Sequence, residues 1–212
     1  MEKELKIKVC GMKFPTNKEA VASLGVDILG FIFYAPSKRY VGTIEEDEKA
    51  KLFDTRKEKA GVFVNEEIET IINCISEFGF NYIQLHGDES PSFCKELKKS
   101  GVRIIKAFRV GKTFDFSQLS NYTDSVDYFL FDTKAEQAGG TGKKFDWFLL
   151  NNYTLQVPFF LSGGIGPDDV NSIKGFNHPM LFGVDLNSGF EDKPGEKNSE
   201  KLNQFIKQLK QE

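Results

Sequence analysis

VPFFLSGG, residues 157–164, is an apolar run that ends in a serine and two glycines. The run is apolar on both faces of an extended chain, which is typical of a strand in a parallel sheet that helices cover on its outer side. We therefore expect residues 157–162 to form a buried strand, with Gly163 and Gly164 in the loop that follows it.

Seven further segments of the chain are strand candidates of the same kind. Eight strands that alternate with helical segments within 212 residues predict a compact (β/α)₈ barrel, because an open doubly wound sheet usually has only five or six strands. Since no linker or shift in composition divides the chain, residues 1–212 are expected to form one barrel domain. The seven segments are residues 6–10, 27–33, 60–64, 81–86, 102–108, 127–132 and 179–185.

Helix signals occupy the segments between these strands. The residues from Thr43 to Glu46 fit a capping box, and Ser90 before Pro91 fits a helix cap followed by a proline in the first turn. Residues 117–122 are a short helix candidate. Two segments show the spacing of one buried helical stripe, namely Ile68, Ile71, Ile72 and Ile75, and Leu202, Phe205, Ile206 and Leu209 with Asn198 or Ser199 as cap.

Composition excludes several classes of protein. The net charge of −3 offers no basic excess for nucleic acid, and no apolar run is long enough to span a bilayer. The first residues lack the apolar core of a secretory signal. Three cysteines without close pairing argue against a disulfide framework or a zinc site. We expect a cytoplasmic protein that needs no metal or cofactor.

Reactive groups of such a barrel belong at the carboxyl ends of its strands. The residues found there include a thiol, an imidazole, carboxylates and guanidinium groups, without the spacing of a metal site. Acid–base chemistry without a metal is the simplest interpretation. These residues are Cys10, Tyr34, Arg39, Asn65, His86, Arg109, Asp132, Ser162 and Asp185.

Three glycine-rich loops follow the later strands. LSGGIGPDD (161–169) and VDLNSGFED (184–192) occupy the two places where barrels frequently bind phosphate, although tight turns alone would also need glycine. AGGTGKKFDW (138–147) fails the nucleotide P-loop pattern, which needs glycine at Gln137 and serine or threonine at Lys144. We expect this third loop to close over a substrate, or to be a plain connector.

Several motifs in register resemble the phosphoribosylanthranilate isomerase family from residue 6 to about residue 198. The family catalyses an Amadori rearrangement of N-(5-phosphoribosyl)anthranilate in tryptophan biosynthesis. The motifs are KVCG (8–11), GFIFYAPSKRYV (30–41), AGVFVN (60–65), IQLHGDE (83–89), LFDTKAEQAGGTGKKFDW (130–147), LSGGI (161–165), GVDLNSG (183–189) and PGEKN (194–198).

The resemblance implies a role for each candidate residue. Asp132 would be the general acid that protonates the ribose ring oxygen, and Cys10 the general base that removes the C2 proton. Arg39 would bind the anthranilate carboxylate, and Asp185 the ribose hydroxyls or the anilino nitrogen. Gln84 and His86 would line the pocket. The phosphate would lie on Gly163, Gly164, Ser188 and Gly189.

A base that acts near neutral pH suits Cys10, because a thiol pKa of about 8.5 could be lowered by neighbouring cations. Asn187 departs from the serine that the family often has there, which weakens the expectation for individual phosphate contacts. Another sugar-phosphate barrel enzyme, or a catalytically silent barrel that binds a sugar phosphate, remains the alternative function. Both a monomer and a homodimer are compatible with the sequence.

Overall fold

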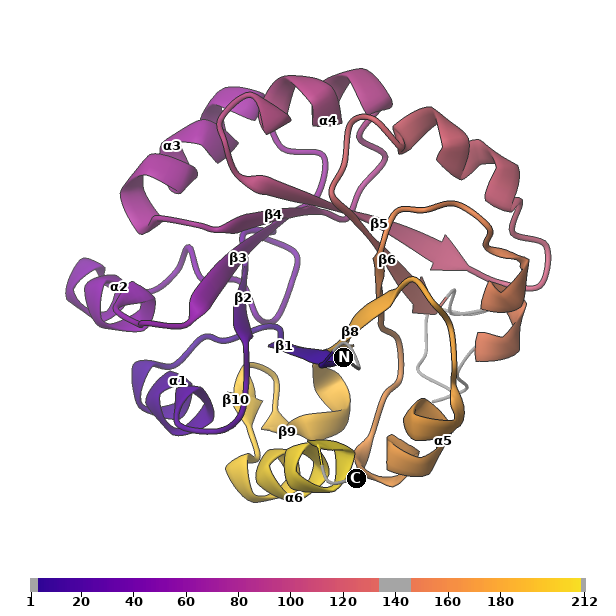
Figure 1. The fold of residues 1–212 in the computed structure, drawn as a ribbon. Helices are drawn as coiled ribbons and strands as arrows, with labels where there is room; N and C mark the ends of the chain where they lie inside the picture. Colours follow the sequence, from indigo (N-terminus) through magenta and orange to yellow (C-terminus); the bar gives the residue numbers. More distant parts are fainter. Residues whose placement is uncertain (1–3, 134–145, 211–212) are drawn as a thin grey trace.

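Eight parallel strands form a closed barrel in the computed structural model, which describes residues 4–133 and 146–210 (Figure 1). Each strand pairs with its neighbours in chain order, and β8 closes the barrel on β1. The fold predicted from the sequence is confirmed, and each strand overlaps its predicted range. The strands are β1 Lys6–Val9, β2 Ile28–Ile32, β3 Glu58–Phe63, β4 Tyr82–Leu85, β5 Arg103–Val110, β6 Tyr128–Thr133, β7 Phe159–Leu161 and β8 Leu181–Leu186.

Helices surround the barrel on its outer side (Figure 1). The α-helices are α1 Pro15–Ala22, α2 Glu46–Phe53, α3 Ile68–Phe78, α4 Pro91–Lys98, α5 Val170–Gly175 and α6 Ser199–Lys210. Four 3₁₀ helices and a hairpin complete the described elements: η1 Phe116–Tyr122, η2 Trp147–Asn152, η3 Pro167–Asp169, η4 Ser188–Phe190, β9 Glu191–Lys193 and β10 Glu196–Lys197. Of the loop expected to close over a substrate, residues 138–145 lie outside the described residues.

Two predicted helix caps are confirmed by their hydrogen bonds. The Ser90 hydroxyl accepts from the Phe93 backbone N–H at 3.2 Å, with Pro91 as the first residue of α4. The Asn198 side chain accepts from the Lys201 N–H at 2.9 Å, which selects Asn198 over Ser199 as the cap of α6. Each bond satisfies one of the backbone donors that a helix leaves without a partner at its start.

Two other helix predictions are wrong in detail. The capping box at Thr43 does not form, because the chain turns there, with the Ile44 N–H donating to the Val41 carbonyl at 3.2 Å, and α2 begins only at Glu46. The stripe of α3 is narrower than predicted, since Ile72 is 41% exposed. Ile72 lies one residue past the fully buried Ile71, and this step of about 100° turns it away from the barrel.

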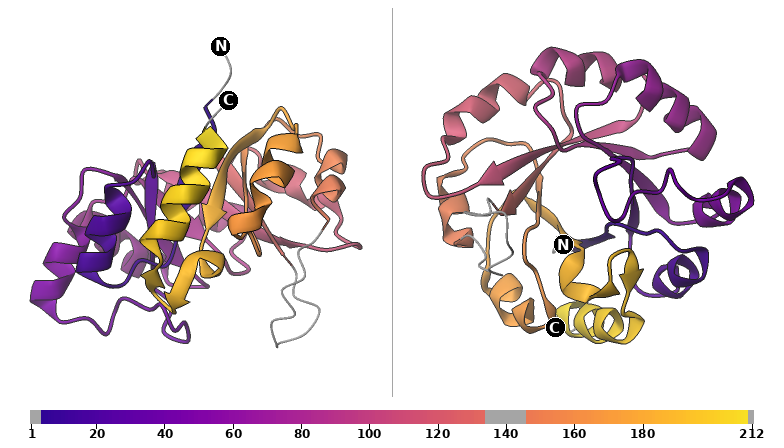
Figure 2. Two further views of the ribbon diagram at one scale, coloured as in Figure 1. Left: turned by 90° about the horizontal axis from the view of Figure 1, so that it is seen from below. Right: turned by 180° about the vertical axis from the view of Figure 1, so that it is seen from behind.

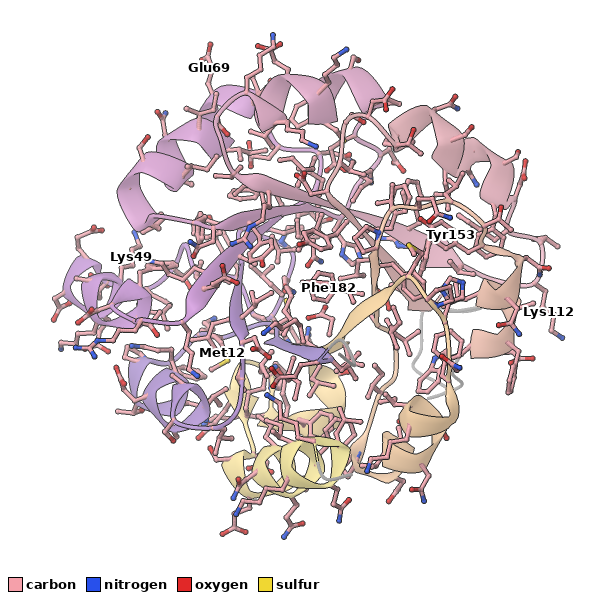
Figure 3. All side chains as sticks on the ribbon, in the orientation of Figure 1. Met12, Lys49, Glu69, Lys112, Tyr153 and Phe182 are labelled. Carbon is pink, nitrogen blue, oxygen red and sulfur yellow. The ribbon has the colours of Figure 1, made fainter. Side chains whose placement is uncertain are left out.

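The apolar core has two parts. The larger part fills the layer between strands and helices and is rich in stacked phenylalanines, such as Phe53 and Phe78, whose ring centroids lie 4.2 Å apart. The smaller part fills the inside of the barrel, where Figure 3 shows Phe182 at the centre of the ring of strands. Its fully buried members are Ile28, Ala60, Tyr82, Ile105, Ala107, Leu130 and Phe160, all from β2 to β7.

The two ends of the barrel differ in what they present. The strand β1 begins and the helix α6 ends at one end of the barrel, whereas the β9–β10 hairpin lies at the other (Figure 2). The hairpin directly follows β8 and η4, so it lies at the carboxyl ends of the strands. Sites of (β/α)₈ enzymes occupy this end, because the loops after all eight strands meet there.

Candidate active site

A cavity of about 170 Å³ lies at the carboxyl ends of the strands. Residues from seven strands, or from the positions directly after them, line it, so distant parts of the chain meet there. Eight of the ten predicted site residues are among them, and Arg39 and Gly189 are not. The lining residues are Cys10, Ile32, Val62, Gln84, His86, Asp132, Ser162, Gly163, Gly164, Ile165, Asp185, Asn187 and Ser188.

Cys10 is held in place from both neighbouring strands. Its backbone N–H donates to the Leu186 carbonyl at 2.9 Å, and its side chain is buried. On the other side a Cβ built at Gly30 would lie 2.9 Å from the Cys10 Sγ, so only glycine leaves the thiol its space. The next residue, Gly11, has φ +78°, a conformation that glycine adopts without strain. The glycine after the thiol thus turns the chain out of β1.

Asp132 and His86 face each other across the pocket. The His86 Nε2 lies 3.4 Å from an Asp132 carboxylate oxygen, and both side chains are partly exposed to the cavity. The Gln84 Nε2 lies 3.0 Å from the His86 Nδ1. With the amide as donor, Nδ1 accepts, and the ring presents an Nε2–H to Asp132. The Oε1 of Gln84 is buried and has no hydrogen-bond partner among the described residues.

The loop after His86 is fixed by the strand ends on both sides of it. The Asn65 side chain accepts from the Asp88 N–H at 2.7 Å, and Glu89 accepts from the N–H groups of Asn65 and Gly87. The buried Lys106 ammonium donates to the Gly87 carbonyl at 2.8 Å and lies 3.2 Å from Glu89. These bonds explain why AGVFVN and IQLHGDE both end in polar residues, because the polar ends of the two motifs hydrogen-bond to each other beside the pocket.

A buried ion pair lies beneath Cys10. The Lys8 ammonium is 2.8 Å from an Asp185 carboxylate oxygen, with side-chain exposures of 0% and 6%. Burial acts to lower the pKa of Lys8, but the charge of Asp185 and the contacts with Cys10 outweigh it, so this pKa is raised. For Cys10 burial is the strongest influence and raises the pKa of the thiol, although Lys8 and Lys197 act in the opposite direction.

The expectation that neighbouring cations lower the thiol pKa is therefore wrong for the net effect. The cations are present, but Cys10 is only 3% exposed. The loss of water around a thiolate therefore destabilises it more than the cations stabilise it. A negative charge close by, on Asp185, adds to the rise. The net influence of its surroundings is thus to raise the pKa of the Cys10 thiol.

Arg39 lies beside the pocket and is held by Glu191. Its Nε and Nη2 donate to the two carboxylate oxygens of Glu191, at 2.8 and 2.5 Å. The buried Lys197 ammonium also donates to Glu191, at 2.6 Å, and to the Asn187 side chain at 2.7 Å. A Cβ at Gly11 would lie 2.6 Å from the Arg39 Cδ, so the arginine crosses over the turn after Cys10. Two cations against one anion leave this cluster positively charged.

The pKa values in this cluster follow from burial and pairing. The hydrogen bond to Glu191 is the main cause that raises the pKa of Arg39. Burial alone would raise the pKa of Glu191, yet its bonds from Arg39 and Lys197 lower it. Burial is the largest influence on Lys197 and lowers its pKa in spite of Glu191, because its side chain has no exposure to water. Glu191 is thus a firmly ionised anchor for both cations.

The two late glycine loops meet at the cavity. Gly163 and Gly164 line it with φ angles of +88° and +70°, and Ser188 begins η4 on the other side. Gly189 has a different task, since a Cβ there would lie 2.2 Å from the Ile165 carbonyl oxygen. Its glycine allows the loop after β8 to pack on the loop after β7. The structure thus brings together three of the four predicted phosphate residues as lining residues.

Three site residues escaped the sequence analysis. Lys8 lies in KVCG, Glu191 in VDLNSGFED and Lys197 in PGEKN, and the resemblance implies no role for any of the three. The signal for Lys8 was a lysine two residues before the candidate base, on the same side of a strand. Nothing local indicates that Glu191 pairs with Arg39, because 152 positions separate them.

Fold and site together define a class: a (β/α)₈ barrel enzyme with acid and base groups and glycine loops at the carboxyl ends of its strands. Among the described residues, no group of three or more His, Cys, Asp or Glu side chains could hold a metal ion. Nor does this part of the chain contain a helix of the length and apolarity needed to cross a bilayer.

The chain belongs to the N-(5'-phosphoribosyl)anthranilate (PRA) isomerase family, which it matches over residues 7–208. The N-(5'-phosphoribosyl)anthranilate isomerase of Parabacteroides distasonis is 47% identical over 204 residues, 96% of this chain and 92% of that protein. A solved structure of mutually generated monomers of dimeric phosphoribosylanthranilate isomerase from Thermotoga maritima has a TM-score of 0.80 at 31% identity. The match covers 98% of this chain and 99% of that one.

A further solved structure of the family is a complex with a small molecule. It is phosphoribosyl anthranilate isomerase in complex with reduced 1-(o-carboxyphenylamino)-1-deoxyribulose 5-phosphate, at 31% identity and a TM-score of 0.81, covering 98% of this chain and 99% of that one. The family assigned from the sequence motifs is thus confirmed.

Proposed function

We propose that this chain, as a phosphoribosylanthranilate isomerase of tryptophan biosynthesis, catalyses its Amadori rearrangement with Asp132 as general acid and Cys10 as general base. The substrate is N-(5-phosphoribosyl)anthranilate and the product is 1-(2-carboxyphenylamino)-1-deoxyribulose 5-phosphate. The observation on which the proposal rests is that Cys10 and Asp132, from β1 and β6, line one cavity together with the glycine loop after β7.

Asp132 opens the ribose ring by giving a proton to the ring oxygen, which leaves an iminium ion at C1. The Nε2–H of His86, 3.4 Å from the Asp132 carboxylate, supports the role, because it can stabilise the carboxylate that remains after the transfer. Gln84 keeps the His86 ring in the tautomer that makes this possible.

Cys10 then removes the proton from C2, which gives the enolamine that tautomerises to the ketone. The positive iminium beside the thiol favours a thiolate, and so it acts against the burial that raises the thiol pKa. A positioned base of this kind typically contributes about 10²–10⁴ in rate.

Each of the two anionic groups of the substrate has a candidate partner, one in the positive cluster beside the cavity and one in the glycine loops that line it. The anthranilate carboxylate would bind at the positive cluster of Arg39 and Lys197, a suitable partner for a forked guanidinium. The phosphate would lie on the loops of Gly163, Gly164 and Ser188, where a backbone without side chains permits close approach. Gly189 would act indirectly, by allowing these loops to pack.

Asp185 would bind the ribose or the anilino nitrogen. One of its oxygens is paired to Lys8 and the other accepts from Ser162 at 3.5 Å, yet the residue still lines the cavity. This leaves it able to accept a hydrogen bond from a ribose hydroxyl or from the anilino nitrogen.

The test begins with a coupled assay. Anthranilate and phosphoribosyl pyrophosphate are converted by a purified transferase, and loss of phosphoribosylanthranilate fluorescence is followed after this protein is added. We expect fast loss, and a fall in kcat of about 10²–10⁴ for Cys10→Ala and for Asp132→Ala. Cys74→Ala on α3 and Asp124→Asn in an exposed loop are matched controls that should keep full activity.

Near-normal turnover in either site variant would contradict the role given to that residue. A folded wild-type protein that leaves the spontaneous rate unchanged would overturn the activity itself, and would favour a barrel that only binds a sugar phosphate.

A further inference from the structure

Lys8 is a lysine in the interior of the barrel, with no exposure to water. It is the register partner of Ile28 on one side and of Asp185 on the other. Ile28 belongs to the apolar cluster inside the barrel, so Lys8 points to the same side. An ammonium group in such a place is costly unless it is paired and hydrogen-bonded. A buried lysine at this position therefore suggests a function for its charge.

The contacts of Lys8 lead directly to the candidate base. Its ammonium is 2.8 Å from the Asp185 Oδ1. The Cys10 thiol is close enough to be among the causes that raise the pKa of Lys8. The lysine and the cysteine are two residues apart on one strand, and therefore on the same face of it. Ser162 donates to the second oxygen of Asp185 at 3.5 Å, which helps to fix the carboxylate. Lys8 is thus held between an anion and a thiol.

We propose that Lys8 is a positioning residue that holds the Cys10 sulfur in place and stabilises its thiolate, with Asp185 as the anchor of the ammonium. The proposal rests on the role of Cys10 as the base. In each cycle the thiolate would take the proton from C2 and become a thiol, and the thiol would release that proton to solvent before the next cycle. Lys8 keeps its charge throughout and exchanges no proton with the substrate.

The charges that face Cys10 come from four elements. Lys8 on β1 is the strongest influence that lowers the pKa of the thiol, and Lys197 on β10 adds to it. Asp185 on β8 raises this pKa, and so does burial, the largest cause of all. Arg39, from the loop after β2, has its own pKa raised in part by Cys10. Lys8 is therefore the main charge that works against burial.

Other charged groups act on Cys10 more weakly or at one remove. Glu191 on β9 is bonded to Arg39 and Lys197 and so balances part of their charge. His86 and Asp132 line the same cavity from β4 and β6, where they contact each other.

The decisive measurement is the pH dependence of Cys10 alkylation by iodoacetamide, followed at this residue by peptide mass spectrometry. It requires no substrate, so it also distinguishes this proposal from the proposed catalysis. Cys74 and Cys94, whose pKa values burial raises to about 11, are references within the same protein. Lys6→Met is the matched control, because Lys6 is a partly exposed lysine two residues earlier on β1 that pairs with Asp27 instead.

In Lys8→Met we expect at least about tenfold slower alkylation of Cys10 at pH 8, which corresponds to a rise of one unit in its pKa. Lys6→Met should behave like the wild type, and Lys8→Arg should regain part of the rate. In turnover, kcat of Lys8→Met should require higher pH, whereas KM should change little. An unchanged alkylation profile in a folded Lys8→Met protein would overturn the proposal.

Asp185→Asn should shift the pKa of Cys10 in the opposite direction to Lys8→Met. Removing the negative charge should lower the pKa of Cys10 and speed its alkylation at a given pH, since Asp185 raises that pKa. If Lys8→Met fails to fold, this variant decides: slower alkylation of Cys10 in folded Asp185→Asn would overturn the proposal, because the charge of Asp185 acts to raise the thiol pKa. An active Cys10→Ala enzyme would contradict the proposed catalysis and leave the electrostatic effect on the thiol intact.

Discussion

Gly30→Ala places one methyl group against Cys10, whose Sγ, Cα and Cβ are the three atoms nearest to it. The added Cβ would lie 2.9 Å from the Cys10 Sγ and 3.0 Å from its Cα, where ordinary contacts begin at about 3.4 Å. Cys10 has little room to retreat, because its N–H is bonded to the Leu186 carbonyl. The Gly30 carbonyl accepts from the Met12 N–H at 3.0 Å, so β2 is tied to the chain after Cys10 as well. The sulfur must shift by roughly half an ångström.

Two opposing terms set the cost in stability. Crowding in a packed interior typically costs about 1–3 kcal/mol, whereas the loss of glycine's freedom in the unfolded chain returns about 0.4–1 kcal/mol. The net loss of about 1 kcal/mol should lower the Tm by about 2–4 °C in a chain of this length. For catalysis the consequence is larger, because a misplacement of about 1 Å can cost roughly 10²-fold. We expect kcat to fall about tenfold, with KM nearly unchanged.

The assay is initial-rate kinetics by phosphoribosylanthranilate fluorescence, with the Tm measured on the same samples. Gly175→Ala is the matched control, since a Cβ there meets nothing within 4 Å. It lies in α5, where alanine favours the helix, so it should keep kcat and gain up to about 1 kcal/mol. A Gly30→Ala enzyme with a lowered Tm and full kcat would refute the reasoning that the position of the thiol limits turnover.

Three further predictions concern the positive cluster and the aromatic layer. Glu191→Gln should raise KM several-fold with a smaller effect on kcat, because Arg39 loses its charged partner. An equal rise of KM in Asp192→Asn, at an exposed carboxylate, would argue against this cause. The stability lost in Glu191→Gln should become smaller as the pH falls below about 4.5, because a carboxyl whose pKa is lower in the folded state stabilises the fold only while it is ionised. Chemical denaturation of both proteins at pH 7 and at pH 3 measures this loss, and an equal loss at the two pH values would contradict the prediction. Phe53→Ala should lower the free energy of unfolding by about 3–5 kcal/mol in denaturant unfolding, because Phe53 is buried against other rings. Phe148→Ala, at a side chain that is 70% exposed, should lower it little. Similar losses in the two variants would contradict the packing argument.

The sequence by itself determined the order of the eight strands and the end of the barrel that holds the site. Strand periodicity is local, so apolar runs such as VPFFL indicate strands without knowledge of their neighbours. Once the fold is a barrel, a residue that follows a strand must lie at the carboxyl end, and for this reason Cys10, His86 and Asp132 could be placed in one site before any coordinates. The motif resemblance then gave them expected roles.

Only the tertiary structure decided how these groups are paired and buried. Lys8 and Asp185 meet because β8 closes the barrel on β1, and 177 positions of chain separate them. Glu191 and Arg39 meet across 152 positions for the same reason. In sequence Lys8 belongs to an alternating strand whose polar side could equally face water. Closure turns that side inward, so the thiol pKa, raised by burial and opposed by a buried lysine, is a property of the closed barrel.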